Sequence, residues 1–100
     1  MKVIYVTLNN SDEAREISHD LLDQNLANCV NFFPITCIYK YKGEVTEEPE
    51  TVLIVKTKEG YYEKVKETIK KHIDYDNFIG QISIDKINDD FTSWLDEVVK

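Results

Sequence analysis

The segment Thr51-Val-Leu-Ile-Val-Lys-Thr57 decides the fold of this chain. Its consecutive apolar residues, Val52–Val55, favour a β-strand because most of them are β-branched. Successive side chains of a strand point to opposite faces, so such a run makes both faces of a sheet apolar. One layer of helices covers only one of those faces. The segment therefore predicts a sheet that needs a partner on its second face, and we expect an oligomer.

Outward from this strand, the apolar pattern alternates between strand and helix periods. Strands are predicted at Val3–Leu8, Cys29–Tyr41 and Phe78–Ile87, and helices at Ser11–Asn25, Lys58–His72 and Phe91–Val98. Lys42-Gly43 is typical of a hairpin turn, since glycine tolerates the positive φ that such turns need. This order predicts an α+β, ferredoxin-like βαβ-βαβ antiparallel sheet with a C-terminal helix. We expect a single domain over residues 1–100.

The charge balance is acidic: 12 Lys and Arg against 19 Asp and Glu give a net charge of −7. An acidic domain without a basic cluster repels phosphate backbones, so we expect no nucleic-acid partner. No apolar run approaches the roughly 18 residues that span a bilayer, so no membrane partner is expected. Met1 leads directly into a strand, without the pattern of a signal peptide, which predicts a soluble cytoplasmic protein.

Cysteine and histidine supply the candidate metal ligands. Cys29 and Cys37 are predicted to lie roughly 26 Å apart on one strand, and therefore to be free thiols. With His19 and His72, they show no zinc-site spacing. A thiolate and an imidazole would bind copper if the fold or a neighbouring subunit brought them together. The alternatives are that the cysteines are small buried side chains, that His72 interacts with a helix dipole, and that His19 lies on the surface.

No catalytic constellation is present, and we expect no enzyme activity. Neither cysteine has a base close in the sequence, and the 3 glycines form no phosphate loop or nucleophile elbow. The acidic residues between Glu44 and Glu50 follow a turn and are interpreted as a solvated rim. Lys56 ends an apolar strand and has two interpretations. Either its stem lies along the sheet, or its charge faces Glu50 or an anionic ligand between subunits.

Four motifs follow one another along the chain: Leu26-Ala-Asn-Cys-Val-Asn31, Tyr39-Lys-Tyr-Lys-Gly-Glu-Val45, Glu50 followed by Lys56-Thr57, and Phe91-Thr-Ser-Trp-Leu95. Together, in this order, they resemble the CutA divalent-cation-tolerance family. Tyr41 stands in the place of the family's tryptophan. The agreement in element order and spacing runs from residue 3 to residue 99.

One motif of that family differs in this chain. The stretch that matches its His-Pro-Tyr motif reads Ile73-Asp-Tyr-Asp-Asn-Phe78, where Tyr75 and Asp76 align but both prolines are absent. The histidine lies one residue early, at His72, which is a rotation of about 100° around a helix. We therefore expect copper binding to be weak and to depend on Cys29 more than on His72.

The resemblance implies a ferredoxin-like fold, a cytoplasmic homotrimer and a link to copper tolerance, with no required cofactor. The same architecture resembles the trimeric PII signalling proteins, so a sensor of small ligands is an alternative function. A purely structural scaffold trimer is another. For the sensor we expect a cleft between subunits that binds a small anion and is formed by Tyr41, Glu50, Lys56, Tyr75 and Trp94.

Overall fold

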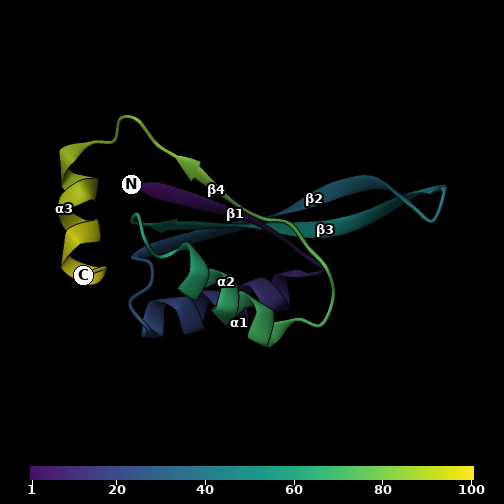
Figure 1. Cartoon of the computed structure of the whole chain (residues 1–100), viewed down its shortest axis with the longest axis horizontal. Helices are drawn as coiled ribbons and strands as arrows, with labels where there is room; N and C mark the ends of the chain where they lie inside the picture. Colours follow the sequence, from purple (N-terminus) through teal and green to yellow (C-terminus); the bar gives the residue numbers. More distant parts are fainter.

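The computed structural model describes residues 1–100 and contains one sheet and three helices (Figure 1). The strands are β1 (Lys2–Leu8), β2 (Cys29–Tyr41), β3 (Glu44–Thr57) and β4 (Ile79–Ser83). The helices are α1 (Ser11–Asp23), α2 (Tyr62–His72) and α3 (Asp89–Val98). None of these helices is both long enough and apolar enough to cross a bilayer.

The strands form one antiparallel sheet in the order β2-β3-β1-β4. Tyr5 of β1, for example, pairs with Ile54 of β3 on one side and with Gly80 of β4 on the other. α1 connects β1 to β2 across β3, and α2 connects β3 to β4 across β1. Each helical connection thus skips one strand, as in ferredoxin-like folds. The predicted fold class is confirmed.

The pairing register corrects two predicted strand boundaries. β3 begins at Glu44 rather than at Thr51, because pairing with β2 starts directly after the turn, at Tyr41 and Glu44. The acidic residues up to Glu50 therefore belong to a strand and not to a rim. β4 ends at Ser83 rather than at Ile87, because its partner strand β1 begins at Lys2, the residue opposite Ser83.

Three helix ends also differ from the prediction, and one of them is the start of α3, at Asp89 rather than at Phe91. α1 ends at Asp23 rather than at Asn25, because Asn25 takes a left-handed φ of 57° that stops a helix. α2 begins at Tyr62 rather than at Lys58, because Gly60 between them has a φ of 91°. All three differences move a boundary and leave the predicted helix in place.

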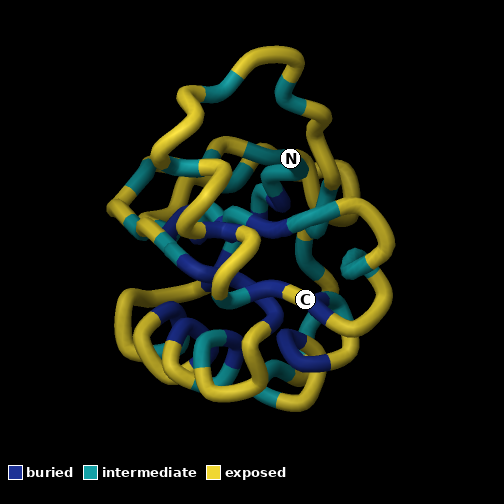
Figure 2. The backbone as a smooth tube through the Cα atoms, turned by 90° about the vertical axis from the view of Figure 1, so that its left-hand side faces the viewer, coloured by how far each residue is buried: buried dark blue, intermediate teal, exposed yellow.

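α1 and α2 lie side by side on one face of the sheet and enclose the core (Figures 1 and 2). The sheet contributes Ile4, Val6, Leu8, Leu53 and Val55, and the helices contribute Ala14, Ile17, Leu21, Val65 and Ile69. All of these side chains are at most 1% exposed. Figure 2 shows that the buried residues gather in the strands and in the two helices beneath them.

The opposite face of the sheet, which we call the helix-free face, is also apolar. Since Ile4, Val6, Leu53 and Val55 point toward the helices, their strand neighbours Val3, Tyr5, Val52 and Ile54 point the other way. Phe33, Phe78 and Ile82 on this side are 43%, 59% and 49% exposed. The prediction of a sheet with two apolar faces is confirmed, and exposed apolar patches of this kind mark interaction surfaces.

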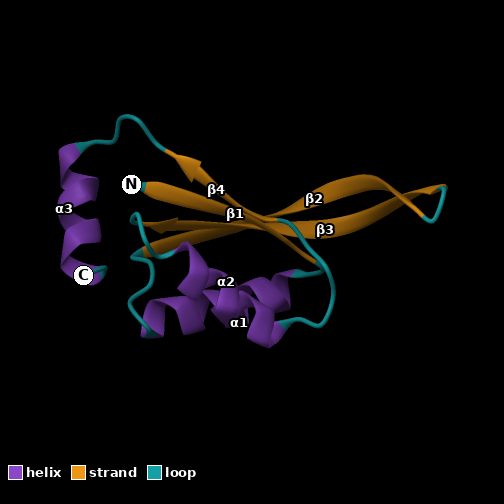
Figure 3. Cartoon of the chain, in the orientation of Figure 1, coloured by secondary structure: helices purple, strands orange, loops and turns teal.

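The β2–β3 hairpin continues beyond the rest of the sheet as an arm of residues 35–50 (Figure 3). β1 ends where Leu8 pairs with Thr51, so the arm strands pair only with each other. The predicted turn is confirmed, with a positive φ at Lys42 (51°) and at Gly43 (82°). The arm explains a radius of gyration of 14.3 Å, above the about 13 Å of a compact 100-residue domain.

Candidate functional site

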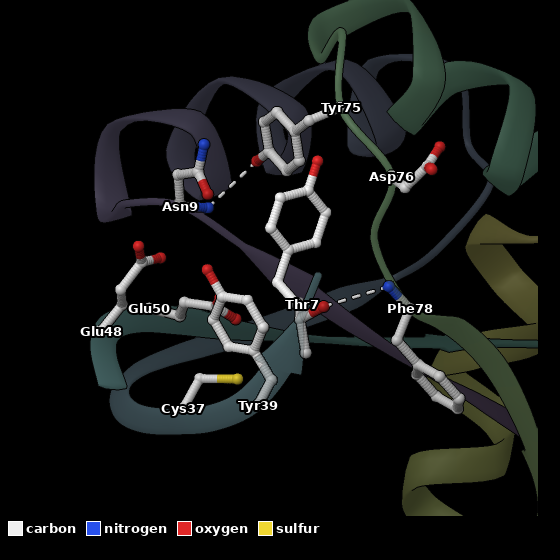
Figure 4. A pocket seen from close by; sticks show the side chains of 10 residues that line it. Thr7, Asn9, Cys37, Tyr39, Glu48, Glu50, Tyr75, Asp76 and Phe78 are labelled. Carbon is white, nitrogen blue, oxygen red and sulfur yellow. Dashed lines mark hydrogen bonds between the residues drawn. The ribbon is translucent and has the colours of Figure 1, made fainter. Parts of the chain in front are cut away.

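The larger of the two main surface pockets lies where the arm meets the body of the chain, and we call it the arm pocket (Figure 4). Its volume is about 660 Å³. The arm contributes Cys37, Tyr39, Tyr41, Glu48 and Glu50. The body contributes Thr7, Asn9, Tyr75, Asp76 and Phe78. The pocket thus combines aromatic rings with carboxylates and has no basic side chain among its lining residues, although Lys42 Nζ lies 5.3 Å from the centre of the Tyr41 ring.

Tyr75 fixes the body wall of the arm pocket through hydrogen bonds to the start of α1. Its hydroxyl donates to Glu13 Oε1 at 2.6 Å and accepts from the Asn9 backbone N–H at 3.0 Å. That N–H also donates to Glu13 Oε1 at 3.0 Å. Burial, together with the Glu13 carboxylate, raises the pKa of Tyr75 well above its ordinary value. The phenol is therefore a neutral donor at physiological pH.

Phe78 is held on the same wall by backbone and ring contacts. Its N–H donates to Thr7 Oγ1 at 3.1 Å, and its carbonyl accepts from the Thr7 N–H at 3.1 Å. The ring meets Tyr5 edge-on, with centroids 6.1 Å apart, and covers Gly80, whose missing Cβ would stand 2.5 Å from the ring. Only glycine leaves room for the ring in that position.

The arm wall of the pocket is polar and acidic. Burial and the nearby Glu50 carboxylate raise the pKa of Cys37, which keeps this thiol protonated at neutral pH. A hydrogen bond to Glu48 raises the pKa of Tyr39. The two carboxylates thus lie beside neutral hydrogen-bonding groups, and no Lys or Arg on the pocket wall neutralises them.

A smaller pocket of about 260 Å³ lies at the other end of the sheet, and we call it the Lys56 pocket. It is lined by Met1, Val3, Lys56, Ile84, Lys86, Ile87, Asn88 and Phe91. Lys56 Nζ lies 3.7 Å from Cys29 Sγ and 5.4 Å from the centre of the Phe91 ring. No carboxylate lines this pocket, so its charge is opposite in sign to that of the arm pocket.

His72 lies away from both pockets, at the last position of α2 as predicted. Its Nε2 donates to Asp20 Oδ2 of α1 at 2.8 Å. Gln24 Nε2 donates to the other oxygen of Asp20 at 2.8 Å and to Thr68 Oγ1 at 3.3 Å. These contacts join α1 to α2. His19, which was predicted to lie on the surface, is exposed.

The residues that were predicted to bind ligands lie in different parts of the structure. Tyr41, Glu50 and Tyr75 line the arm pocket, whereas Lys56 and Cys29 meet in or beside the Lys56 pocket. Trp94 of α3 is 45% exposed and packs edge-on against Phe91, with ring centroids 5.4 Å apart. Within one chain the five cleft residues therefore do not form a single site, and a shared cleft between subunits stays a prediction.

Several residues of these sites were not predicted. Glu13 and Asp20 lie on α1 and contact residues 62 and 52 positions away. Tyr39 and Glu48 belong to the arm, as does Cys37, which was predicted as a candidate metal ligand and not as part of this pocket. The alternation of Cys37, Tyr39 and Tyr41 is the one signal in the sequence that places them on a common face.

Asp20→Asn should lower the melting temperature in a pH-dependent way. Hydrogen bonds from His72 and then Gln24 lower the pKa of Asp20 below its ordinary 3.8. A carboxyl group of this kind stabilises the folded state above its ordinary pKa, and the contribution is lost as the pH falls through the lowered value. The pair is partly exposed, so the effect at neutral pH should be below about 1 kcal/mol.

Thermal unfolding of parent and variant between neutral pH and pH values well below 3.8 measures this difference. Asp23→Asn is the matched control, because Asp23 is an exposed carboxylate of the same helix without an ion pair. If the difference in melting temperature between the parent and Asp20→Asn persists unchanged in acid, the charge of the carboxylate has no role in stability.

The whole chain matches known proteins of one kind. The family model described as CutA1 divalent ion tolerance protein matches residues 2–98. The divalent-cation tolerance protein CutA of Pyrococcus horikoshii is 33% identical over 101 residues, which cover 100% of this chain and 99% of that protein. The corresponding Thermus thermophilus protein is 36% identical, with 96% and 95% covered. The structure of the periplasmic divalent cation tolerance protein CutA from Archaeoglobus fulgidus superimposes with a TM-score of 0.95 at 33% identity, covering both chains fully.

Proposed function

This chain belongs to the CutA1 divalent ion tolerance family, and we propose that it serves in tolerance of divalent metal ions as a cytoplasmic homotrimer that binds copper ions through Cys29. The match over residues 2–98 is the observation that carries the link to metal tolerance. We propose a binding protein rather than an enzyme, because the family is described by tolerance of divalent ions and the sequence shows no phosphate loop and no base close to either cysteine.

The helix-free face supports the oligomer. α1 and α2 cover one face of the sheet, and Phe33 and Ile82 remain about half exposed on the other. Burying such a face is favourable by roughly 25 cal/mol per Å² of apolar surface. The number of subunits, three, is the one that the resemblance to the family implies.

The residues present fit copper only as a cargo ion held by one strong ligand. Sulfur is a soft ligand that selects Cu(I), and Cys29 is a free, half-buried thiol. However, no three His, Cys, Asp or Glu side chains of one chain gather closely enough to hold a metal ion. The ammonium group of Lys56 lies 3.7 Å from Cys29 Sγ, and its positive charge repels a copper ion that binds to this thiol. Further ligands would have to come from a neighbouring subunit.

Cys29→Ser should weaken copper binding by at least about tenfold, or 1.4 kcal/mol. His72→Ala should change it little, because His72 is engaged by Asp20. Cys37→Ser is the matched control, since Cys37 is the other half-buried free thiol of β2. Calorimetric titration with Cu(I) under reducing conditions, and with Cu(II), measures the affinities. Equal affinity in the parent, Cys29→Ser and His72→Ala would contradict the assignment and leave Cys29 as a packing residue.

The location in the cytoplasm rests on two free thiols, Cys29 and Cys37, which persist in reducing compartments. The relative from Archaeoglobus fulgidus is described as periplasmic, so the two compartments must be separated by experiment. Fractionation of cells that express the untagged chain tests this, and recovery with periplasmic markers would contradict our proposal.

The second candidate function is a sensor of small anions, and the Lys56 pocket favours it. Lys56 and Lys86 line this pocket together with apolar side chains, and no acid lies among them. A carboxylate or phosphate compound with an apolar part would meet both features. A trimer that binds neither copper nor an anion would be a scaffold.

Lys56→Ala should abolish stabilisation by any anion that binds in this pocket. Screening carboxylates and nucleotides by thermal shift identifies such a compound with the parent protein. Lys64→Ala, which removes an exposed lysine of α2, should keep the full response. If Lys56→Ala melts like the parent and shows the same ligand profile, Lys56 is a surface residue and the sensor proposal fails.

A further inference from the structure

The aromatic walls of the arm pocket are its first distinctive feature. Tyr39 and Tyr41 stand on the arm, and Tyr75 and Phe78 stand on the body, so rings line both sides of a hollow of about 660 Å³ (Figure 4). This volume lies within the about 300–1,000 Å³ of sites that bind small organic molecules. Hydrogen bonds to Glu13 and Asn9 already hold Tyr75, so its ring stays in place without a ligand.

The charge of the arm pocket selects the kind of ligand. Glu48 and Glu50 on the arm and Asp76 on the body are its charged lining residues, and all three are acids. The whole chain adds a net charge of −7, which attracts cations over a longer range. A ring face also attracts a cation, with about 0.5–2 kcal/mol for each favourable contact. Rings and carboxylates therefore favour the same class of ligand.

A bare metal ion fits this pocket poorly. The acids of the pocket are not among any group of three metal-binding side chains close enough to hold an ion. Burial and Glu50 raise the pKa of Cys37, so a metal ion would first have to displace the proton of this thiol. Four rings are unsuited to a hydrated ion, which needs oxygen contacts on all sides. The ligand should therefore be cationic and organic.

We propose that the arm pocket is a binding site for small organic ammonium compounds, with the cationic nitrogen between the ring faces and the Glu48 and Glu50 carboxylates. Asp76 lines the body side of the pocket and adds a second negative charge there, so a linear diamine should bind more tightly than a monoamine of the same length. This site is separate from Cys29 and the Lys56 pocket, and it does not depend on the proposed copper binding.

The experiment is a calorimetric titration of the assembled protein with 1,4-diaminobutane, 1-aminobutane, choline and neutral 1,4-butanediol. Saturable binding of the ammonium compounds is expected, with 1,4-diaminobutane tightest and no heat from the diol. Glu50→Gln and Tyr41→Ala should each lower the affinity for 1,4-diaminobutane by at least about fivefold, close to 1 kcal/mol. Glu47→Gln is the matched control, since Glu47 is exposed on the same strand but points to the other face. Its affinity should equal that of the parent.

Further measurements distinguish this site from its alternatives. Cys29→Ser should bind 1,4-diaminobutane like the parent, whether or not the copper assignment holds. Binding of the diol with similar affinity would show an unselective apolar hollow. Competition by equimolar Mg²⁺ or Ca²⁺ would show a metal site. Either result overturns the proposal, as does the absence of saturable ammonium binding or equal weakening by Glu47→Gln and Glu50→Gln.

Discussion

Ile82→Asp should convert the assembled protein into a folded monomer. The parent is expected to scatter light as a particle of about 35 kDa, three times the chain mass of 11.7 kDa. Ile82 lies on the helix-free face and is 49% exposed in a single chain. A carboxylate there is solvated in the monomer, but it would be buried without a partner in an assembly that covers this face. Breaking such an apolar contact with an unpaired charge costs several kcal/mol.

The neighbouring residue provides the control for this experiment. Gln81 is exposed on the same strand and points to the other face, so Gln81→Asp adds the same charge outside the expected interface. It should leave the mass unchanged. Light scattering and far-UV circular dichroism at the same concentration separate dissociation from unfolding. A parent mass of 11.7 kDa, or an Ile82→Asp mass equal to that of the parent, would exclude an interface at Ile82.

The sequence predicted the fold because its apolar periods are strong where the core is formed. Val52–Val55 have no helical interpretation in so short a segment, and in the structure their side chains alternate between two apolar faces. The arm was predicted only in part. Its β3 half is rich in acids that disfavour a strand on their own, and pairing with β2 outweighs that propensity.

The sites were harder to predict because they depend on contacts between distant segments. Glu13 meets Tyr75 across 62 positions, and Asp20 meets His72 across 52. In the sequence Glu13 also satisfies the pattern of a helix start, where Asn10 Oδ1 does accept the Glu13 N–H at 2.9 Å. A residue whose local role already explains it gives no signal of a second role in the tertiary structure.

The two pockets each receive a charged residue from β3. Glu50 and Lys56 lie on this strand and face the same side of the sheet, because they are an even number of residues apart. Yet they line pockets of opposite charge: Glu50 lines the acidic arm pocket, and Lys56 lines the pocket that contains two lysines. This separation is why the ammonium experiment, which depends on Glu50, can be interpreted independently of the copper and anion experiments, which depend on the neighbouring residues Cys29 and Lys56.

Leu53→Ala should lower the free energy of unfolding by about 2–5 kcal/mol, the range for a leucine removed from a close-packed core. Leu53 is 0% exposed and lies between its strand partners Val6 and Phe32, beneath α1 and α2. The surrounding strands cannot collapse into the space, because their hydrogen-bond register fixes their spacing. Leu53→Met is the control, and its conserved volume should limit the loss to below about 1.5 kcal/mol.

Ile54→Ala extends this experiment to the helix-free face of the same strand. Ile54 is only half-buried in one chain, so in a monomer its truncation should cost clearly less than that of Leu53. If a second copy covers the face, both truncations remove a fully buried side chain and their costs should be similar. Denaturant unfolding must be compared at one protein concentration, because dissociation contributes to the stability of an oligomer. A small loss for Ile54→Ala beside a large one for Leu53→Ala would contradict the covered face that Val52–Val55 first suggested.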